Sequence, residues 1–252
     1  MSGTGSKEDG RGRLGAMVSG LAVAVGCVLF LGGFAWAAVV YQPYTIPTDS
    51  MAPTMNPGDR VLAERIDGAD VRRGDVVVFT DEDWAATPMV KRVVGIGGDE
   101  VACCDKDGRL TVNGTPVDEP YVEQEPTAAG GKAAPASPQE FSATVPKGKI
   151  FLLGDERATS VDSRVHLQEA GQGSVPLSAV QARVDAVAWP MNGMIDRPSS
   201  FAALPGGVSA AGPLPLQLGA ILAGVVLILG GAVYGPVAAR LSRRKAPAGG
   251  AR

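Results

Sequence analysis

A charge-free stretch from residue 14 to residue 48 constrains this 252-residue chain more than any other feature. Within it, "AMVSGLAVAVGCVLFLGGFAWAAVV" (16–40) is long enough to cross a bilayer, which takes about 20 apolar residues in a helix. The alternative is a cleaved signal peptide, because "AWA" at 35–37 resembles a small-residue cleavage site. The apolar region of a signal peptide usually runs only about 7–15 residues, so the length favours a retained membrane anchor.

A second apolar run, "LGAILAGVVLILGGAVYGPVAA" (218–239), is followed by four basic residues between 240 and 245. Three more basic residues lie between 7 and 13, ahead of the first run. Since Lys and Arg collect on the cytoplasmic side of membrane spans, we expect both termini in the cytoplasm and the middle outside the cell membrane. The expected division is a leader (1–13), a transmembrane helix (14–40), an exported domain (41–197), a linker (198–213), a second transmembrane helix (214–239) and a basic tail (240–252).

The charge is unevenly distributed along the chain. Eight of the 23 Lys/Arg and only two of the 26 Asp/Glu lie in 1–40 and 214–252, so the middle has an excess of nine acidic residues. An acidic exported region is a poor partner for nucleic acid. The bilayer is the partner that the two apolar runs predict.

The exported region has the pattern of short β-strands. Runs rich in β-branched residues at 59–66, 74–79, 89–96 and 180–190 are separated by Gly, Asp and Pro. In "RLTVNGTPVD" (109–118), Asn113-Gly114 suits the type I′ turn of a β-hairpin, while 124–140 is an Ala/Gly/Pro-rich surface loop. We therefore expect a mostly β, antiparallel exported domain between one N-terminal and one C-terminal transmembrane helix.

Three cysteines allow two interpretations. Cys27 lies inside the first apolar run, whereas Cys103 and Cys104 are adjacent and either form a vicinal disulfide or remain free core thiols. No CxxC or Cys/His spacing is present, so we expect no metal site.

Ser50, in "YTIPTDSMAPTMNPGDRV" (44–61), is a candidate nucleophile that needs a base. The single histidine, His166, lies in a polar segment and is expected to be an ordinary surface residue. Lys91 and Arg92 must project to opposite sides of a strand, so one of them faces an apolar side. A buried lysine can lose its proton and act as a base, but an arginine cannot. The alternative is that either side chain extends to solvent at a sheet edge.

Four segments in this order resemble the conserved boxes of the type I signal peptidases, membrane-anchored Ser/Lys endopeptidases that remove signal peptides from exported proteins. They are "SMAPTM" with "GDRV", "RGDVVVF" (73–79), "VKRVVGIGGDEV" (90–101) and "GDERATSVDSR" (154–164). The resemblance covers about residues 41–190 and makes 103–145 a variable cap insertion.

The resemblance implies a role for each matching residue. Ser50 would attack, Lys91 would be the general base, and the Thr48 hydroxyl with the Ser50 N–H would form the oxyanion hole. It implies cleavage of preproteins after small residues through an acyl-enzyme, with no cofactor and with the secretion translocon as a further partner. For the exported domain it implies a barrel-like catalytic fold. Among the supporting residues, the Ser160 hydroxyl would help to orient Lys91, Asp162 and Arg164 would stabilise the site by pairing, and Asp155 would lie beside them. Shallow substrate pockets would be lined by Ile46, Pro47, Met51, Val61, Val78 and Val90.

Two positions depart from the family pattern. Glu156 stands where the family usually has Asn, and Gly97 stands where it usually has Pro. Two rival hypotheses are a Ser/Lys protease of another specificity, such as a self-cleaving regulator, and a catalytically inactive membrane-anchored binding factor. The two spans argue against the first, and the presence of both Ser50 and Lys91 argues against the second.

Overall fold

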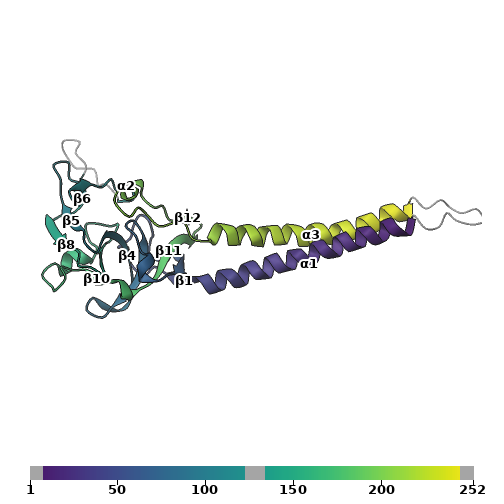
Figure 1. Cartoon of the computed structure of the whole chain (residues 1–252), viewed down its shortest axis with the longest axis horizontal. Coiled ribbons are helices and arrows are strands. Elements are labelled where there is room, and N and C mark those ends of the chain that lie inside the picture. The colour runs from purple at the N-terminus through teal and green to yellow at the C-terminus, as the bar shows by residue number, and fades with distance from the viewer. Residues whose placement is uncertain (1–7, 123–133, 245–252) are drawn as a thin grey trace, which may run out of the picture. The chain divides into compact units, whose positions relative to one another are not determined.

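The computed structural model describes residues 8–122 and 134–244. The ends of the predicted leader and tail and part of the predicted 124–140 loop lie outside these residues. The chain divides into a helical unit, built from its two ends, and a β-rich unit, residues 41–212 (Figure 1).

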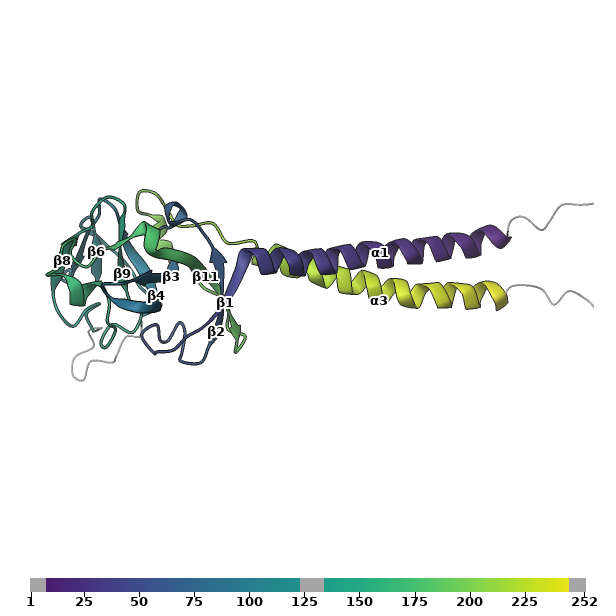
Figure 2. The ribbon, with the colours of Figure 1, turned by 90° about the horizontal axis from the view of Figure 1, so that it is seen from below.

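The helical unit consists of α1 (Glu8–Val40) and α3 (Leu214–Arg244). Gly15–Val40 and Leu214–Val237 are each long and apolar enough to cross a membrane, with a mean hydropathy of 2.3. Figure 2 shows the two helices running side by side. The prediction of one apolar helix near each end is confirmed.

Small residues bring α1 and α3 into close contact. A Cβ added to Gly26 would lie 2.8 Å from the Gly224 carbonyl oxygen, and one added to Gly224 would lie 2.7 Å from the Gly26 oxygen. The Ser19 hydroxyl donates a hydrogen bond of 2.7 Å to the Gly231 oxygen. Close backbone approach through Gly and Ser is how helices commonly associate in a bilayer.

The β-rich unit contains two antiparallel sheets. The larger has eight strands in the order β1-β2-β11-β3-β4-β9-β10, with β12 paired to β11, and the smaller has the order β7-β6-β5-β8. The mostly β, antiparallel fold is as predicted. The strands of the larger sheet are β1 (Tyr41–Thr45), β2 (Arg60–Arg65), β3 (Val76–Asp81), β4 (Ala85–Ile96), β9 (Lys149–Leu153), β10 (Val175–Pro176), β11 (Val180–Trp189) and β12 (Gly193–Met194). Those of the smaller sheet are β5 (Glu100–Cys103), β6 (Leu110–Val112), β7 (Thr115–Pro116) and β8 (Phe141–Thr144).

Strand β3 shows why the larger sheet has a core on both sides. Its continuous run Val76–Phe79 is buried throughout, as expected for a strand covered on both faces. Val76 and Val78 belong to one apolar cluster, while Val77 and Phe79 belong to another. Alternation along the strand therefore sends successive side chains into two separate cores.

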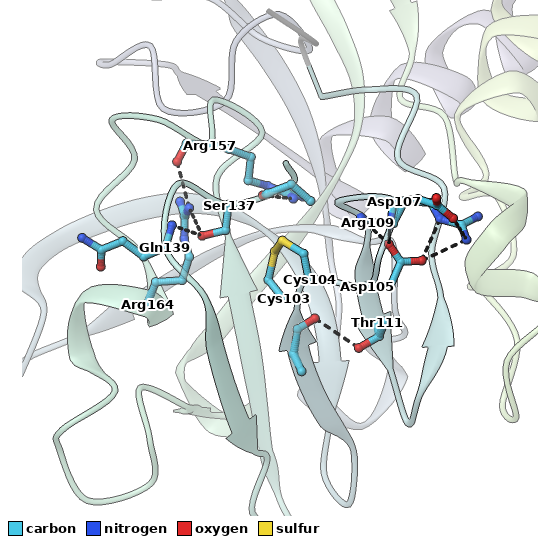
Figure 3. The surroundings of a disulfide bond; sticks show 12 residues. Cys103, Cys104, Asp105, Asp107, Arg109, Thr111, Ser137, Gln139, Arg157 and Arg164 are labelled. Atoms are coloured by element: carbon cyan, nitrogen blue, oxygen red, sulfur yellow. Dashed lines mark hydrogen bonds and ion pairs between the residues drawn. A yellow bond between two sulfur atoms is a disulfide. The ribbon is translucent and has the colours of Figure 1, made fainter. Parts of the chain in front are cut away.

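Three strands of the smaller sheet, β6, β7 and β8, lie within the predicted cap insertion (103–145), and β5 ends where that insertion begins. The turn between β6 and β7 has positive φ at both Asn113 (54°) and Gly114 (75°), which a type I′ turn requires, so the predicted hairpin is confirmed. Strand β5 ends at Cys103, which is joined to Cys104 by a disulfide, and this decides between the two interpretations of the pair. Figure 3 draws the bridge among the side chains that surround it.

Three short 3-10 helices connect strands, and the short helix α2 lies between β12 and α3. Residues 198–213 were predicted to be a linker, and the sequence did not indicate that they contain the helix α2. Phe201 of this helix is completely buried in the core. The Ser209 hydroxyl also donates to Asp75 Oδ2 at 2.6 Å. Apolar anchors within a Pro/Gly/Ser-rich segment are enough to pack it onto the sheet. The segments are η1 (Gly68–Asp70), η2 (Ser163–His166), η3 (Leu177–Ala179) and α2 (Ser199–Ala202).

Candidate active site

Ser50 lies in the loop between β1 and β2. The Ile46 N–H donates to the Asp59 carbonyl (2.9 Å) and the Gly58 N–H to the Ile46 carbonyl (2.8 Å), which closes the base of the loop. Met51 and Met55 are almost fully buried and anchor the loop to the core. Ser50, immediately before Met51, is left partly exposed. The loop therefore presents the hydroxyl from a fixed backbone.

Lys91 lies in the middle of β4, opposite Val77 of β3, and its Nζ is 2.7 Å from Ser50 Oγ. The residue is only 5% exposed. Burial lowers the pKa of Lys91, since an ammonium loses hydration inside the protein. The carboxylates of Asp162 and Asp155 act in the opposite direction, and the charge of Arg164 adds to the lowering. The net result is an amine that loses its proton more readily than an ordinary lysine.

Thr48 shares the same loop as Ser50. Its Oγ1 lies 3.2 Å from Ser50 Oγ, and its side chain is exposed. Ser50 Oγ therefore lies within hydrogen-bond distance of both the Thr48 hydroxyl and the Lys91 amine.

Gly154, at the end of β9, lies directly against the nucleophile loop. A Cβ added to Gly154 would lie 2.4 Å from the Ser50 carbonyl oxygen and 2.1 Å from Ser160 Oγ, so only glycine fits. The Glu156 N–H donates to the same Ser50 oxygen at 3.2 Å. The segment from 154 onward is therefore the surface against which Ser50 is held.

Asp162 and Arg164 form the pair that the resemblance implies. Asp162 is completely buried and accepts from Arg164 Nη2 (2.7 Å) and Nε (2.8 Å). Its Oδ2 also accepts from the Gly154 N–H at 3.0 Å. The pair thus stabilises the backbone beside Ser50.

Ser160 differs from its expected arrangement. It is 8% exposed, and its hydroxyl has no hydrogen-bond partner among the residues that the structure describes. The expected contact with Lys91 is absent from this part of the chain, and the hydroxyl instead lies against Gly154.

Asp155 pairs with Arg92, a site residue that sequence reasoning missed. Arg92 is 1% exposed and donates from Nε (2.8 Å) and Nη2 (2.7 Å) to the two carboxylate oxygens. Thr54 adds a hydrogen bond of 2.6 Å to Asp155 Oδ2. Both basic residues of β4 are therefore buried, and neither extends to solvent as the alternative allowed. An arginine on a buried strand requires a carboxylate partner, so the sequence signals that a partner exists but not which residue it is.

The residues predicted to line substrate pockets fall into two groups. Pro47 is exposed beside Thr48. The other five belong to one apolar cluster, and of these five only the partly buried Val90 is more than 2% exposed. The members of that cluster that were predicted are Ile46, Met51, Val61, Val78 and Val90.

The two departures from the family pattern have local explanations. The Glu156 carboxylate accepts from the Thr159 N–H at 2.7 Å and from the Thr159 hydroxyl, so it caps its own turn. A Cβ at Gly97 would lie 3.0 Å from the Lys147 Cα and from the Gly148 nitrogen, so glycine permits a close approach of that loop. The Ser50–Lys91 contact involves neither side chain.

His166 is more enclosed than predicted. Its ring stacks on Trp84 with centroids 4.5 Å apart, and its Nδ1 lies 2.7 Å from Glu169 Oε1. Among the residues that the structure describes, the His166 ring contacts Trp84 and Glu169 and not Ser50. No group of three or more His, Cys, Asp or Glu suited to a metal occurs within residues 8–122 and 134–244.

The family model "Signal peptidase, peptidase S26" matches residues 17–189, which includes every residue of this site. The chain belongs to this family. Signal peptidases of this kind are serine endopeptidases whose substrates are preproteins with signal peptides. With its two candidate membrane helices, this signal peptidase is membrane-anchored, and the predicted family, activity and enzyme class are confirmed.

Several named relatives are similar to this signal peptidase. A probable signal peptidase I of Mycobacterium leprae is 30% identical over 60% of this chain and 69% of its own length. Signal peptidase I of Bacillus licheniformis is 30% identical over 69% of this chain and 88% of its own length. A crystal structure of a signal peptidase I from Enterococcus faecalis is 27% identical and covers 44% of this chain and 94% of its own, with a TM-score of 0.34. At that TM-score the assignment rests on the sequence comparisons.

Proposed function

We propose that this chain cleaves signal peptides with Ser50 as nucleophile and Lys91 as general base. The observation that supports this assignment is the 2.7 Å separation of Lys91 Nζ and Ser50 Oγ, with the lysine buried on a central strand. Burial lowers the pKa of Lys91, so the neutral amine needed to take a proton is available closer to neutral pH.

The reaction is an acyl transfer in two halves. Neutral Lys91 takes the Ser50 proton while Oγ attacks the carbonyl carbon of the scissile bond. The resulting Lys91 ammonium protonates the leaving amine as the C–N bond breaks, which leaves an ester on Ser50. Water, deprotonated by the same amine, hydrolyses this ester and regenerates the enzyme. The Ser50 N–H and the Thr48 hydroxyl stabilise the oxyanion, and one such donor is typically worth about 3–4 kcal/mol.

The remaining residues support this chemistry. Asp162 with Arg164, and Asp155 with Arg92, hold the segment from 154 onward against Ser50. The Ser160 hydroxyl, unpartnered among the described residues, is available to accept from Lys91 when the amine is protonated. Because the apolar cluster beneath the loop is filled by its own side chains, only a shallow floor remains for substrate, which favours small residues before the cut. Of the predicted lining residues, Val90 and Pro47 are the ones open to a substrate, and Ile46, Met51, Val61 and Val78 form the buried layer beneath them.

The basic residues at both ends of the sequence support a topology with both termini in the cytoplasm and the β-rich unit outside the cell membrane. The secretion translocon, which delivers preproteins to that side, is then a partner. Accessibility of a single cysteine placed at exposed Lys147 tests the orientation. Labelling of intact cells by an impermeant thiol reagent supports it, and labelling only after lysis contradicts it.

Cleavage itself tests the site. The full chain in detergent should cut a preprotein after an Ala-x-Ala sequence, and sequencing of the new N-terminus identifies the bond. Ser50→Ala and Lys91→Ala should each reduce kcat by at least about 1000-fold while each variant remains folded at the assay temperature. Normal cleavage by either folded variant would overturn the assignment.

A further inference from the structure

Arg157 is a buried cation in the loop on which Ser50 rests. Its Nε donates to the Gly154 carbonyl at 3.0 Å, and its own carbonyl accepts from Arg164 Nη1 at 2.8 Å. Figure 3 labels Arg157 and Arg164 together near Ser137. Arg157 therefore contacts the two positions, 154 and 164, that flank the segment beside the nucleophile.

Glu119 neutralises Arg157 from a different part of the chain. It follows β7, in the cap insertion, and accepts from Arg157 Nη1 (2.7 Å) and Nη2 (2.6 Å). Both side chains are 5% exposed. A two-pronged pair with this burial is geometrically specific, because the planar guanidinium accepts a carboxylate in one orientation.

Tyr121 connects this pair to Arg92. Its hydroxyl donates to Glu119 Oε1 at 2.5 Å, and its ring centroid lies 3.8 Å from the Arg92 Cζ. The edges of the Arg92 guanidinium are occupied by Asp155 and the Gly74 carbonyl, so the ring covers the face that remains.

These contacts form a closed circuit, because Gly154 and Asp155 are neighbours in the chain. From these contacts we infer that Glu119 and Tyr121 are positioning residues for the proposed Ser50–Lys91 pair. They fix Arg157 and Arg92, and through them the backbone on which Ser50 lies. This role rests on the proposed function and extends it to a segment outside the four sequence boxes. The circuit runs Asp155, Arg92, Tyr121, Glu119, Arg157 and Gly154.

The circuit also has an electrostatic consequence for Lys91. Two carboxylates and two guanidiniums balance within it. Removal of the Glu119 charge leaves the positive charge of Arg157 to act on Asp155, one of the carboxylates that favour an ammonium at Lys91, so that ammonium is disfavoured. Since the active base is the neutral amine, the acid limb of the kcat/KM profile should move to lower pH.

The test compares Glu119→Gln with Asp118→Asn in the full-length enzyme cutting a preprotein. Asp118 is the matched control because it is the adjacent carboxylate, and its side chain is 79% exposed. Glu119→Gln should lower kcat about 10- to 100-fold, change KM less than threefold and shift the acid limb to lower pH, while Asp118→Asn leaves all three unchanged. A folded Glu119→Gln enzyme whose kcat and pH profile match those of Asp118→Asn would overturn the inference.

A second pair of variants decides the matter if Glu119→Gln does not fold. Tyr121→Phe keeps the ring over Arg92 but removes the hydrogen bond to Glu119, so it should lower kcat less than Tyr121→Leu, which removes both contacts and should lose at least about tenfold. Equal kcat values for Phe and Leu would contradict the positioning role. Failure of the proposed function itself gives a different result, since Ser50→Ala would then still cleave.

Discussion

Lys91 Nζ lies 2.7 Å from Ser50 Oγ although the two residues are 41 positions apart in the chain. The amine comes from a central strand and the hydroxyl from a loop anchored by two buried methionines. The contact therefore depends on the sheet and on the loop together, and the following predictions probe both.

Lys91→Arg should be inactive, with kcat reduced at least about 1000-fold, because a guanidinium keeps its proton at any pH the enzyme survives. Steady-state cleavage of a preprotein measures this. Lys147→Arg, at an exposed position, is the control and should retain full activity. Substantial activity in Lys91→Arg would mean that position 91 contributes charge and not proton transfer.

Lys91 should reduce stability at neutral pH. Burial places the folded-state pKa of Lys91 below the unfolded value, so the unfolded chain binds more protons between the two. The free energy of unfolding then rises as pH rises through that window. Lys91→Met, of similar shape, should therefore raise the unfolding temperature near pH 7, and the difference should shrink toward pH 10. A difference in unfolding temperature that grows with pH would contradict a lowered pKa for Lys91 in the folded protein.

Asp155→Asn should destabilise the β-rich unit by about 3–5 kcal/mol, because it leaves the buried Arg92 guanidinium without its counter-charge. Chemical denaturation followed by tryptophan fluorescence measures the change. Asp107→Asn is the control, since its pair with Arg109 is exposed and should change stability by less than about 1 kcal/mol. Similar losses in both variants would argue against a special role for the buried pair.

Gly154→Ala should lower kcat about 100-fold, because the added methyl group overlaps the Ser50 carbonyl and Ser160, and a displacement of about 1 Å is enough for such a loss. Gly219→Ala, where the methyl group meets nothing within 4 Å, should cleave normally. Parent-level activity in Gly154→Ala would show that the loop adjusts without affecting the nucleophile.

Alkylation should count one free thiol in the unreduced, denatured chain and three after reduction, since Cys103 and Cys104 are bridged and Cys27 is free. Mass spectrometry of the alkylated protein measures this directly. Three labelled thiols before reduction would contradict the bridge.

The sequence predicted the parts of the fold that local patterns determine. Apolar length identified both helices, β-branched runs located β2, β3, β4 and β11, and Asn113-Gly114 marked its turn. Strand β1 was missed because its sequence, Tyr-Gln-Pro-Tyr-Thr, contains a proline and lacks an apolar alternation.

Strand alternation predicted that one of Lys91 and Arg92 faces an apolar side, and the resemblance to the type I signal peptidases selected Lys91 as the partner of Ser50. The partner of Arg92, and the circuit through Glu119 and Tyr121, could not be predicted, because each depends on a contact between segments about 30 to 60 residues apart. Periodicity carries no information about such contacts. Likewise, the composition of 198–213 suggested a linker, whereas the burial of Phe201 depends on a pocket that other segments form.

Detection of the acyl-enzyme tests the central claim most directly. An activated ester of an Ala-x-Ala peptide is mixed with the enzyme, quenched in acid within one turnover, digested and analysed by mass spectrometry. We predict an acyl group on the peptide that contains Ser50 in the parent enzyme, and none when Lys91→Ala is treated in the same way. An acyl group on another residue, or equal acylation of Ser50 in Lys91→Ala, would contradict a Ser50–Lys91 mechanism.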